Sequence, residues 1–380
     1  MALWWTMLTS SPPPEQVLPG APTGGDESAR RWRRWMSVLL AVAIVVVVVF
    51  VAGSVVRLPY YTISPGEALD LNSRITIEGA ESYPTDDEIM LLFVRERARV
   101  NVWRWLQASV DPDIDLFREQ QFTGGLDPEE VRVESDADMA RSQLAAKKLA
   151  LEAAGYDVPV GEGLVVLAVS PSRPAADILE SGDVLVSVDG QPLLDPDDLS
   201  EIVRTHEPGE PIEVTLVRDG EEQTVTVPTE AADDGTPIIG VYVSGRYDFP
   251  VAVKVDTSAI GGPSAGLAMS LSILDAITPG DLAGGKKVAV TGTIAEDGAV
   301  GEIGGLSQKA TTAKASDAEL FIVPACTRED VKASCEAELA SAKHRAGDLA
   351  VVPVATFDEA LAALAAAGGD PVDVAAAVAA

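Results

Sequence analysis

The chain has 380 residues, more than one ordinary hydrophobic core holds, so we expect two or three domains. Hydrophobic residues make up 47% of the chain, which excludes a disordered polypeptide. The net charge is −31, and this acidity argues against a globular part that binds nucleic acid or anionic lipid.

An apolar segment near the N-terminus is long enough to cross a bilayer. It runs from Ser37 to Val56 without a charged residue, and twenty helical residues span about 30 Å. Such a run exceeds the apolar region of a cleaved signal peptide. We therefore predict that residues 36–57 form a retained transmembrane helix in the cell membrane. The arginines of the Pro-rich, basic segment 1–35 precede it, so the positive-inside rule places that segment in the cytoplasm and all later domains outside.

Residues 58–155 are predicted to form an extracytoplasmic N-terminal region, and they show no recognisable chemistry. Short strand patterns at Ile75–Ile77 and Ile89–Val94 are followed by a helical pattern from Asp136 to Ala154. The sequence does not indicate what residues 78–135 contribute.

Short strands and turns follow from residue 156 to 230, and a hairpin signal lies at Asp219-Gly220. This stretch resembles a bacterial PDZ domain through three motifs: Ser172-Arg173-Pro174-Ala175-Ala176, Gly182-Asp183-Val184-Leu185 and Val188-Asp189-Gly190. The resemblance implies a small β-rich domain that adds an extended peptide to a sheet edge and holds its C-terminal carboxylate with backbone N–H groups. Gly163 and Leu164, at the start of the first strand, are the predicted peptide-binding residues.

A turn with the features of a nucleophile site begins the last third of the chain. The sequence runs from Gly261 through Gly262, Pro263 and Ser264 into a helical pattern of leucines. A serine in the first turn of a helix is exposed beside backbone N–H groups that lack helical partners, and these can hold an oxyanion. Serine is also a common N-cap, so this turn taken alone favours capping.

A second pair of elements follows. A buried strand and turn contain Thr291, and the glycines of Gly304-Gly305-Leu306 precede a helix with Lys309 in its first turn. Taken alone, Lys309 reads as a surface lysine, as does Lys314 later in the same helix.

Together these pieces resemble the proteolytic domain of Lon proteases over about residues 237–360. That family places its serine in a Pro-Ser-Ala-Gly turn and its lysine a little over forty residues later, three positions after Gly-Gly-Leu. Ser264 and Lys309 are 45 positions apart. The resemblance implies that Ser264 is the nucleophile, that Lys309 is its general base, and that Thr291 orients the lysine amine. Gly261 and Thr293 depart from acidic residues common in that family, which leaves any regulation or preference taken from Lon in doubt.

The physical chemistry of the chain agrees with a lysine base. The two histidines, His206 and His344, lie in the PDZ-like part and in a polar helix near the end, so a Ser-His-Asp triad is poorly supported. A lysine serves as a base when burial lowers its pKa toward neutrality, and the small apolar neighbours of Lys309 permit this.

The whole order resembles the YlbL-type bacterial PDZ-containing Lon-like proteases. We expect an α/β (α+β) protease domain at residues 235–365, behind the PDZ domain and the transmembrane helix, and an Ala-rich tail at 366–380. The glycine-rich stretch Gly280–Lys287 leads into a strand, whereas a phosphate loop leads into a helix. The expected activity is therefore ATP-independent endopeptidase action on unfolded or flexible protein segments, with no cofactor.

Several points stay open on the sequence. Cys326 and Cys335 form no CxxC motif and no metal site is expected; they are either free thiols or a disulfide. A homo-oligomer is implied by the Lon resemblance alone. The rival functions are a non-catalytic PDZ scaffold at the membrane and a self-cleaving precursor.

Overall fold

The computed structural model describes residues 25–83, 88–124, 127–256 and 262–372. Residues 1–24 of the predicted cytoplasmic tail and 373–380 of the predicted Ala-rich tail lie outside this part of the chain. The fold divides into two units, one of residues 1–57 with 101–103 and one of the remainder.

The first unit is built on helix α1 (Gly25–Val55). Its residues Arg30–Val55 form the one helix of the described chain that is long and apolar enough to cross a membrane. The ring of Trp103 stacks on Phe50 with a centroid distance of 5.6 Å, and its Nε1 donates to the Phe50 carbonyl at 3.0 Å. The helix begins before the predicted segment 36–57 because the basic residues that precede the apolar run are also helical.

A mixed sheet with the strand order β18-β17-β14-β3-β1-β4 forms the centre of the second unit. The first four strands are parallel, and β1 runs antiparallel to both of its neighbours. The strands in chain order are β1 (Tyr60–Asp70), β3 (Glu88–Arg97), β4 (Asp115–Arg118), β14 (Lys287–Val290), β17 (Leu320–Pro324) and β18 (Ala350–Val354).

The region 58–155 is part of this sheet, not a separate domain. Four consecutive residues of β3, from Ile89 to Leu92, are buried, as is typical of a strand covered on both faces. Ile89 and Leu91 pack into one hydrophobic cluster and Leu92 into another, because successive side chains point to opposite faces. The described parts of residues 58–100 and 104–158 therefore share one three-layer α/β/α body with the predicted protease segment from residue 249 to 365, and we call this body the core.

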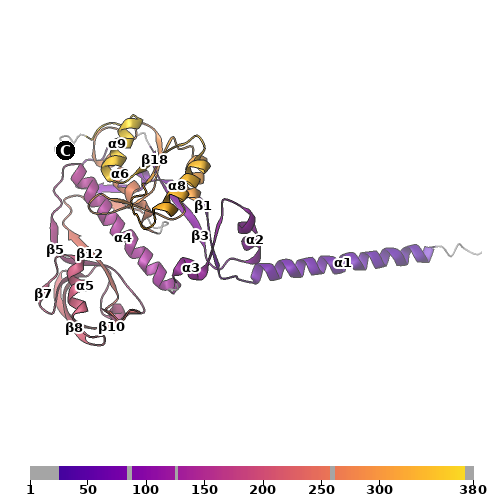
Figure 1. Cartoon of the computed structure of the whole chain (residues 1–380), viewed down its shortest axis with the longest axis horizontal. Helices are drawn as coiled ribbons and strands as arrows, with labels where there is room; N and C mark the ends of the chain where they lie inside the picture. Colours follow the sequence, from indigo (N-terminus) through magenta and orange to yellow (C-terminus); the bar gives the residue numbers. More distant parts are fainter. Residues whose placement is uncertain (1–24, 84–87, 125–126, 257–261, 373–380) are drawn as a thin grey trace, which may run out of the picture. The chain divides into compact units, whose positions relative to one another are not determined.

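Helices cover both faces of the sheet (Figure 1). One layer holds α4 (Pro128–Ala153), α6 (Gly266–Ile277) and α9 (Phe357–Ala367), and the other holds α7 (Leu306–Ala315) and α8 (Lys332–Ala346). Helix α4 begins at Pro128, eight residues before the predicted start. Asp127 caps it by accepting a hydrogen bond from the N–H of Glu129 at 2.9 Å.

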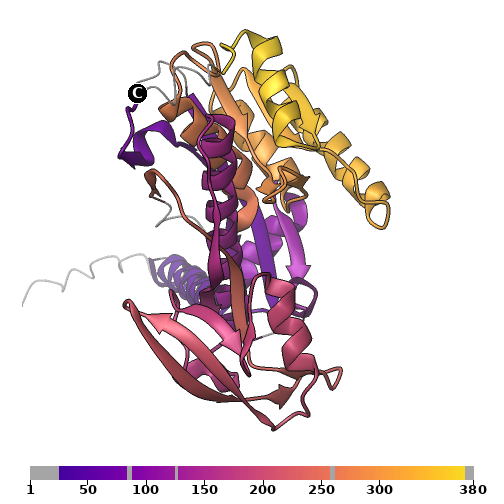
Figure 2. The ribbon, with the colours of Figure 1, turned by 90° about the vertical axis from the view of Figure 1, so that its left-hand side faces the viewer.

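A second sheet is inserted between α4 and the rest of the core, and we call residues 159–248 the inserted domain. Its order is β12-β5-β6-β8-β9, with β7 beside β6. Its elements are β5 (Val160–Val169), β6 (Val184–Val188), β7 (Gln191–Pro192), α5 (Pro196–Arg204), β8 (Pro211–Arg218), β9 (Glu221–Pro228), β10 (Glu230–Ala231), β11 (Pro237–Ile238) and β12 (Val241–Tyr247). The chain enters and leaves at one point, since the N–H of Asp248 donates to the Pro159 carbonyl at 3.0 Å. Figure 2 shows α4 reaching from the core to this domain.

The remaining elements are short: β2 (Ile75–Glu78), α2 (Val102–Val110), α3 (Glu119–Thr123), β13 (Ala252–Val255), β15 (Thr293–Ile294) and β16 (Val300–Gly301). Cys326 and Cys335 form a disulfide, with their Cα atoms 5.7 Å apart. The bond joins the segment after β17 to the first turn of α8, which settles the question that the sequence left open.

Candidate active site

Ser264 lies in a 3₁₀ turn, Pro263–Ala265, which leads directly into α6. Gly262 precedes the turn with φ of +87°, a conformation that side chains other than glycine rarely adopt. Pro263 then sets the backbone for the first helical position. This local structure is what the sequence predicted, and Gly261, the departure from the Lon pattern, lies outside the described residues.

Gly266, two residues after the serine, is required by packing. A Cβ there would lie 2.2 Å from the Ser142 Oγ and 2.7 Å from the Ile294 Cγ2. Helix α6 therefore approaches α4 and the strand β15 more closely than any larger residue allows. This contact explains why a glycine follows Ser264 and Ala265.

Lys309 lies on α7, which covers the face of the sheet opposite to α6. Its side chain extends to Ser264. Its Nζ lies 2.8 Å from the Ser264 Oγ and 2.9 Å from the Thr291 Oγ1. Thr291 follows β14, is fully buried, and also donates to the Ser264 carbonyl at 3.3 Å. The structure thus brings Ser264, Lys309 and Thr291 together.

The environment of Lys309 changes its acidity. Its side chain is 2% exposed, and burial lowers the pKa of its amine to about 7, since charge is costly away from water. The carboxylates of Glu96 and Glu338 act in the opposite sense, because negative charge favours the ammonium. At neutral pH a large fraction of the amine is unprotonated and can accept a proton from the serine.

Two glutamates whose charges act on Lys309, Glu96 and Glu338, were not identified from the sequence. Glu96 lies at the end of β3, where burial raises the pKa of its carboxyl and Lys309 lowers it. Glu338 lies on α8 and accepts a hydrogen bond from the N–H of Leu306 at 2.8 Å, which caps α7. Both lie far from the serine in sequence, and only the packing of the strands and helices brings them near Lys309.

A cleft of about 530 Å³ opens at Ser264 and Lys309. Apolar side chains from β1, β3, α3 and the segment before α7 line it, with the carboxylates of Glu96 and Glu302 at its wall. The apolar lining residues are Ile63, Phe93, Val94, Phe122 and Ile303. The cleft is large enough for an extended peptide segment to reach the serine.

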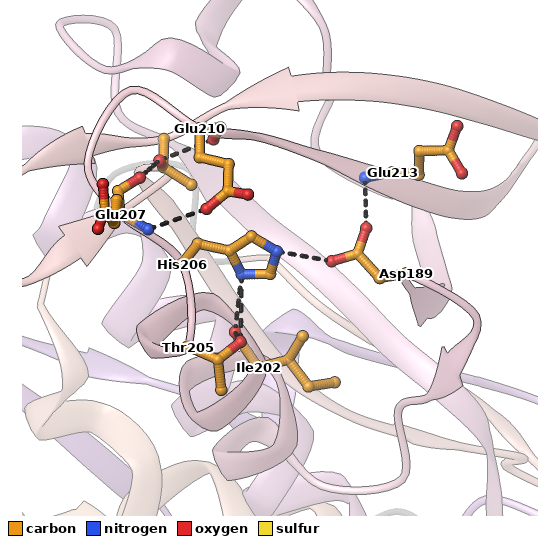
Figure 3. Close-up of polar contacts among 8 residues, drawn as sticks. Asp189, Ile202, Thr205, His206, Glu207, Glu210 and Glu213 are labelled. Carbon is orange, nitrogen blue, oxygen red and sulfur yellow. Dashed lines mark hydrogen bonds and ion pairs between the residues drawn. The ribbon is translucent and has the colours of Figure 1, made fainter.

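The two histidines lie away from Ser264. In Figure 3 the ring of His206 lies between α5 and the turn after β6. Its Nε2 is 3.0 Å from the Asp189 Oδ2, and its Nδ1 is 3.1 Å from the Ile202 carbonyl oxygen. His344 lies in the last turn of α8 and is exposed. His206 therefore links elements of the inserted domain, and the side-chain amine in contact with the Ser264 Oγ is that of Lys309.

The prediction that Gly163 and Leu164 bind a peptide needs correction. Both lie in β5, which is paired with β12 on one side and β6 on the other, and Leu164 is fully buried. A strand with partners on both sides cannot accept a peptide at its edge. The sheet's two edge strands are β12 and β9, and β12, beside β5, is the last strand of the inserted domain in the chain. The first strand in sequence is therefore not an edge strand.

A groove of about 390 Å³ runs beside β12 and is lined by α5 and the segment before the strand. The carbonyl of Gly240 accepts from the Ser170 N–H at 2.9 Å, and that of Ile239 accepts from the Ala175 N–H at 3.0 Å. Because the N–H and C=O of a trans peptide point in opposite directions, the N–H groups of Val241 and Gly240 face away from these partners. The signal in the sequence was Ile239-Gly240-Val241, an apolar-Gly-apolar pattern ahead of a strand.

Two family models match the chain. Residues 131–229 match the PDZ domain, and residues 247–366 match the Lon protease (S16) C-terminal proteolytic domain. The chain therefore contains a PDZ domain followed by a Lon-type proteolytic domain, behind one apolar N-terminal helix. Residues 131–153 of the PDZ match form most of α4, and β12 lies after the end of that match. In the structure the PDZ domain therefore begins and ends later in the chain, at residues 159 and 248.

Known proteins are similar to parts of the chain. A Lon protease of Lachnoclostridium phytofermentans is 37% identical over 120 residues, 30% of this chain and 13% of that protein. The magnetosome formation protease MamE of Paramagnetospirillum magneticum is 38% identical over 71 residues, 18% of this chain and 10% of that protein. The PDZ domain of an SdrC-like protein of Listeria innocua covers 21% of this chain at 26% identity, with 92% of that domain matched and a TM-score of 0.21. The chain spans between a tenth and a fifth of the length of the curated relatives it matches.

Proposed function

We propose that the chain is a membrane-anchored serine endopeptidase that needs no ATP, with Ser264 as nucleophile and Lys309 as general base. The observation that carries this proposal is the contact of a buried lysine amine with a serine hydroxyl at 2.8 Å, inside a Lon-type proteolytic domain. A serine hydroxyl becomes a nucleophile when a base takes its proton. Thr291 supports the pair because its Oγ1 fixes the position of the amine.

The reaction proceeds in two halves. The Ser264 Oγ attacks the scissile carbonyl carbon while the neutral Lys309 amine takes its proton, and the ammonium then gives that proton to the leaving amine. The acyl group stays on Ser264. A water molecule attacks this ester as Lys309 accepts a proton from it, and Ser264 recovers its hydroxyl proton as the carboxylic acid leaves.

Independence from ATP is part of the proposal. The glycine-rich stretch Gly280–Lys287 leads into β14, and the Lys286 amine bonds to the Ala367 carbonyl of α9. A phosphate loop needs a helix after the glycines and a free lysine. Substrates are therefore expected to be unfolded or flexible segments, which reach Ser264 without forced unfolding.

The inserted PDZ domain would supply recognition. We propose that a substrate segment pairs with the free edge of β12, and that the N–H groups of Gly240 and Val241 hold its C-terminal carboxylate. Helix α1 would anchor the protein with its N-terminus in the cytoplasm, because the arginines precede the apolar run. Both domains would then act outside the cytoplasm.

Proteolysis by the purified full chain in detergent micelles tests the proposal. An unfolded, disulfide-free protein should be cleaved without nucleotide, and added ATP should not change the rate. Ser264→Ala and Lys309→Arg should each be inactive, the second because a guanidinium keeps its proton. Lys314→Ala, on the exposed side of the same helix, is the matched control and should retain activity. Cleavage that survives in Ser264→Ala would refute the assignment.

A further inference from the structure

A buried hydroxyl on α4 faces the peptide group that precedes the nucleophile. Ser142 is 3% exposed, and its Oγ donates to the Pro263 carbonyl at 2.9 Å. A serine within a helix ordinarily bonds to the carbonyl four positions earlier, as Ser270 does with Gly266 at 3.0 Å. Ser142 instead reaches a residue 121 positions away, and so links α4 to the turn of Ser264.

This bond sets the orientation of one peptide plane. The Pro263 carbonyl and the Ser264 N–H belong to the same planar trans peptide, so they point in opposite directions. Because the carbonyl is held by Ser142, the Ser264 N–H is turned away from α4. The Gly266 N–H also donates to that carbonyl, but it belongs to the turn itself and moves with it.

The next peptide plane is held from another segment. The Ser264 carbonyl accepts from the Gly292 N–H at 3.0 Å and from the Thr291 Oγ1 at 3.3 Å. The two planes that flank Ser264 are therefore fixed by different parts of the core, one by the segment after β14 and one by α4. Of the two, only the plane with the Pro263 carbonyl depends on a single side chain outside the turn.

The turn needs this external restraint. Gly262 adjoins it and permits a wide range of backbone conformations. The ring of Pro263 fixes the φ of that residue but leaves free the ψ that orients its carbonyl. Gly266 on the other side allows α6 to approach so closely that only a small side chain fits on α4 opposite it. A serine at position 142 meets both needs, since it is small and carries a donor.

We infer that Ser142 is a positioning residue, which holds the Pro263–Ser264 peptide so that the Ser264 N–H stabilises the oxyanion of the tetrahedral intermediate. Oxyanion donors accelerate acyl transfer because they are aimed in advance at the charge that develops. Ser142 does not line the cleft, and the hydrogen bonds of the Lys309 amine go to other residues. Its loss should therefore weaken stabilisation of the transition state and leave substrate binding and the pH profile unchanged. The inference rests on the proposed function.

The test compares Ser142→Ala and Ser142→Cys with the parent full chain, on a short peptide substrate and on a peptide boronate that forms a tetrahedral adduct with Ser264. We expect kcat to fall about 10- to 100-fold in Ser142→Ala, below the loss for an oxyanion donor removed outright, with KM within about threefold. Boronate affinity should fall by the same factor as kcat. Ser142→Cys should be intermediate, because a thiol is a weak donor.

Ser270→Ala is the matched control, since it removes a buried serine hydroxyl from α6 whose bonds stay within that helix. It should keep both the kcat and the boronate affinity of the parent. Rates are expressed per active site, titrated with a fluorophosphonate that labels Ser264, so a partly unfolded variant is not mistaken for a slow one. A kcat of Ser142→Ala within twofold of the parent, or a fall in kcat without a matching fall in boronate affinity, overturns the inference. A parent chain without activity refutes the proposed function instead.

Discussion

At the residue scale, the proposed chemistry depends on burial, which lowers the pKa of the Lys309 amine. Lys309 is buried and its amine is hydrogen-bonded to the hydroxyls of Ser264 and Thr291. Glu96 and Glu338 are near enough to raise its pKa, and burial outweighs them. The balance between burial and these two charges sets the pH at which the base becomes available.

We predict that kcat/KM rises with pH through about 7, because Lys309 must lose its proton before it can accept one from Ser264. Glu96→Gln removes a negative charge that favours the ammonium, so the midpoint should move down by about 0.5–1 pH unit. Rate profiles from pH 5 to 9 check this. Glu302→Gln is the control, since Glu302 lines the same cleft but does not act on the pKa of Lys309, and its midpoint should stay in place. A midpoint near 10 in the parent would contradict the burial argument.

At the element scale, the start of the helix that carries Lys309 is held by a neighbouring helix. Helix α7 begins after Gly305 at φ of +70°, and Glu338 of α8 caps its first N–H. Helix α8 is in turn joined to the end of β17 by the disulfide of Cys326 and Cys335. The position of Lys309 therefore depends on α8, a helix that contributes no side chain to the hydrogen bonds of the Lys309 amine.

The double variant Cys326→Ser/Cys335→Ser should lower the free energy of unfolding by about 2–3 kcal/mol, as expected for a loop closed by residues nine positions apart. Urea denaturation of the parent with and without reductant measures this. Reduction should bring the parent to the stability of the variant and should not affect the variant. Equal stabilities in all four samples would mean that the thiols are not paired in solution, which would also weaken the proposed location outside the cytoplasm.

Local patterns in the sequence predicted more of the site than of the fold. The turn of Ser264 and the lysine after Gly304-Gly305-Leu306 are short-range patterns, and the structure brings their side chains within hydrogen-bonding distance. The pairing of β3 with β14 could not be predicted, because about two hundred residues and a whole inserted domain separate the two strands. The prediction of a peptide site at Gly163 and Leu164 was wrong for a related reason, since the edge strand β12 beside β5 comes last in the inserted domain.

At the scale of the whole molecule, the PDZ domain is an insertion into the protease core. The central sheet of the core contains strands that come before the insertion in the chain and strands that come after it. Helix α4 contacts both the core and the inserted domain. On this helix, Ser142 contacts the turn of Ser264. Glu130 of the same helix accepts hydrogen bonds from Ser170 at 2.6 Å and Tyr242 at 3.3 Å beside the groove of β12. One continuous helix thus contacts both the turn of Ser264 and the groove beside β12.

The two chain segments that connect the core to the inserted PDZ domain lie side by side. The inserted domain can therefore be deleted and its ends joined by a short turn. Val160 and Tyr247 are directly opposed partners in an antiparallel ladder, so a two-residue Asn-Gly turn can join them in place of residues 161–246. Tyr247 is retained because its ring packs against the core and its hydroxyl bonds to Glu296. We predict that this shortened chain folds and cleaves a short unstructured peptide within about threefold of the parent rate, because the cleft and the residues around Lys309 lie wholly in the core.

The same chain should lose binding to peptides captured through β12, measured by fluorescence anisotropy, and should cleave long substrates more slowly at low concentration. Ser264→Ala in the shortened chain is the control that assigns the remaining activity to the same site. If the shortened chain folds, by circular dichroism, yet fails on the short peptide, then catalysis requires the contacts that Ser170 and Tyr242 make with α4. The helix would then couple an occupied groove to the turn of Ser264, and the PDZ domain would control the reaction as well as recognise the substrate.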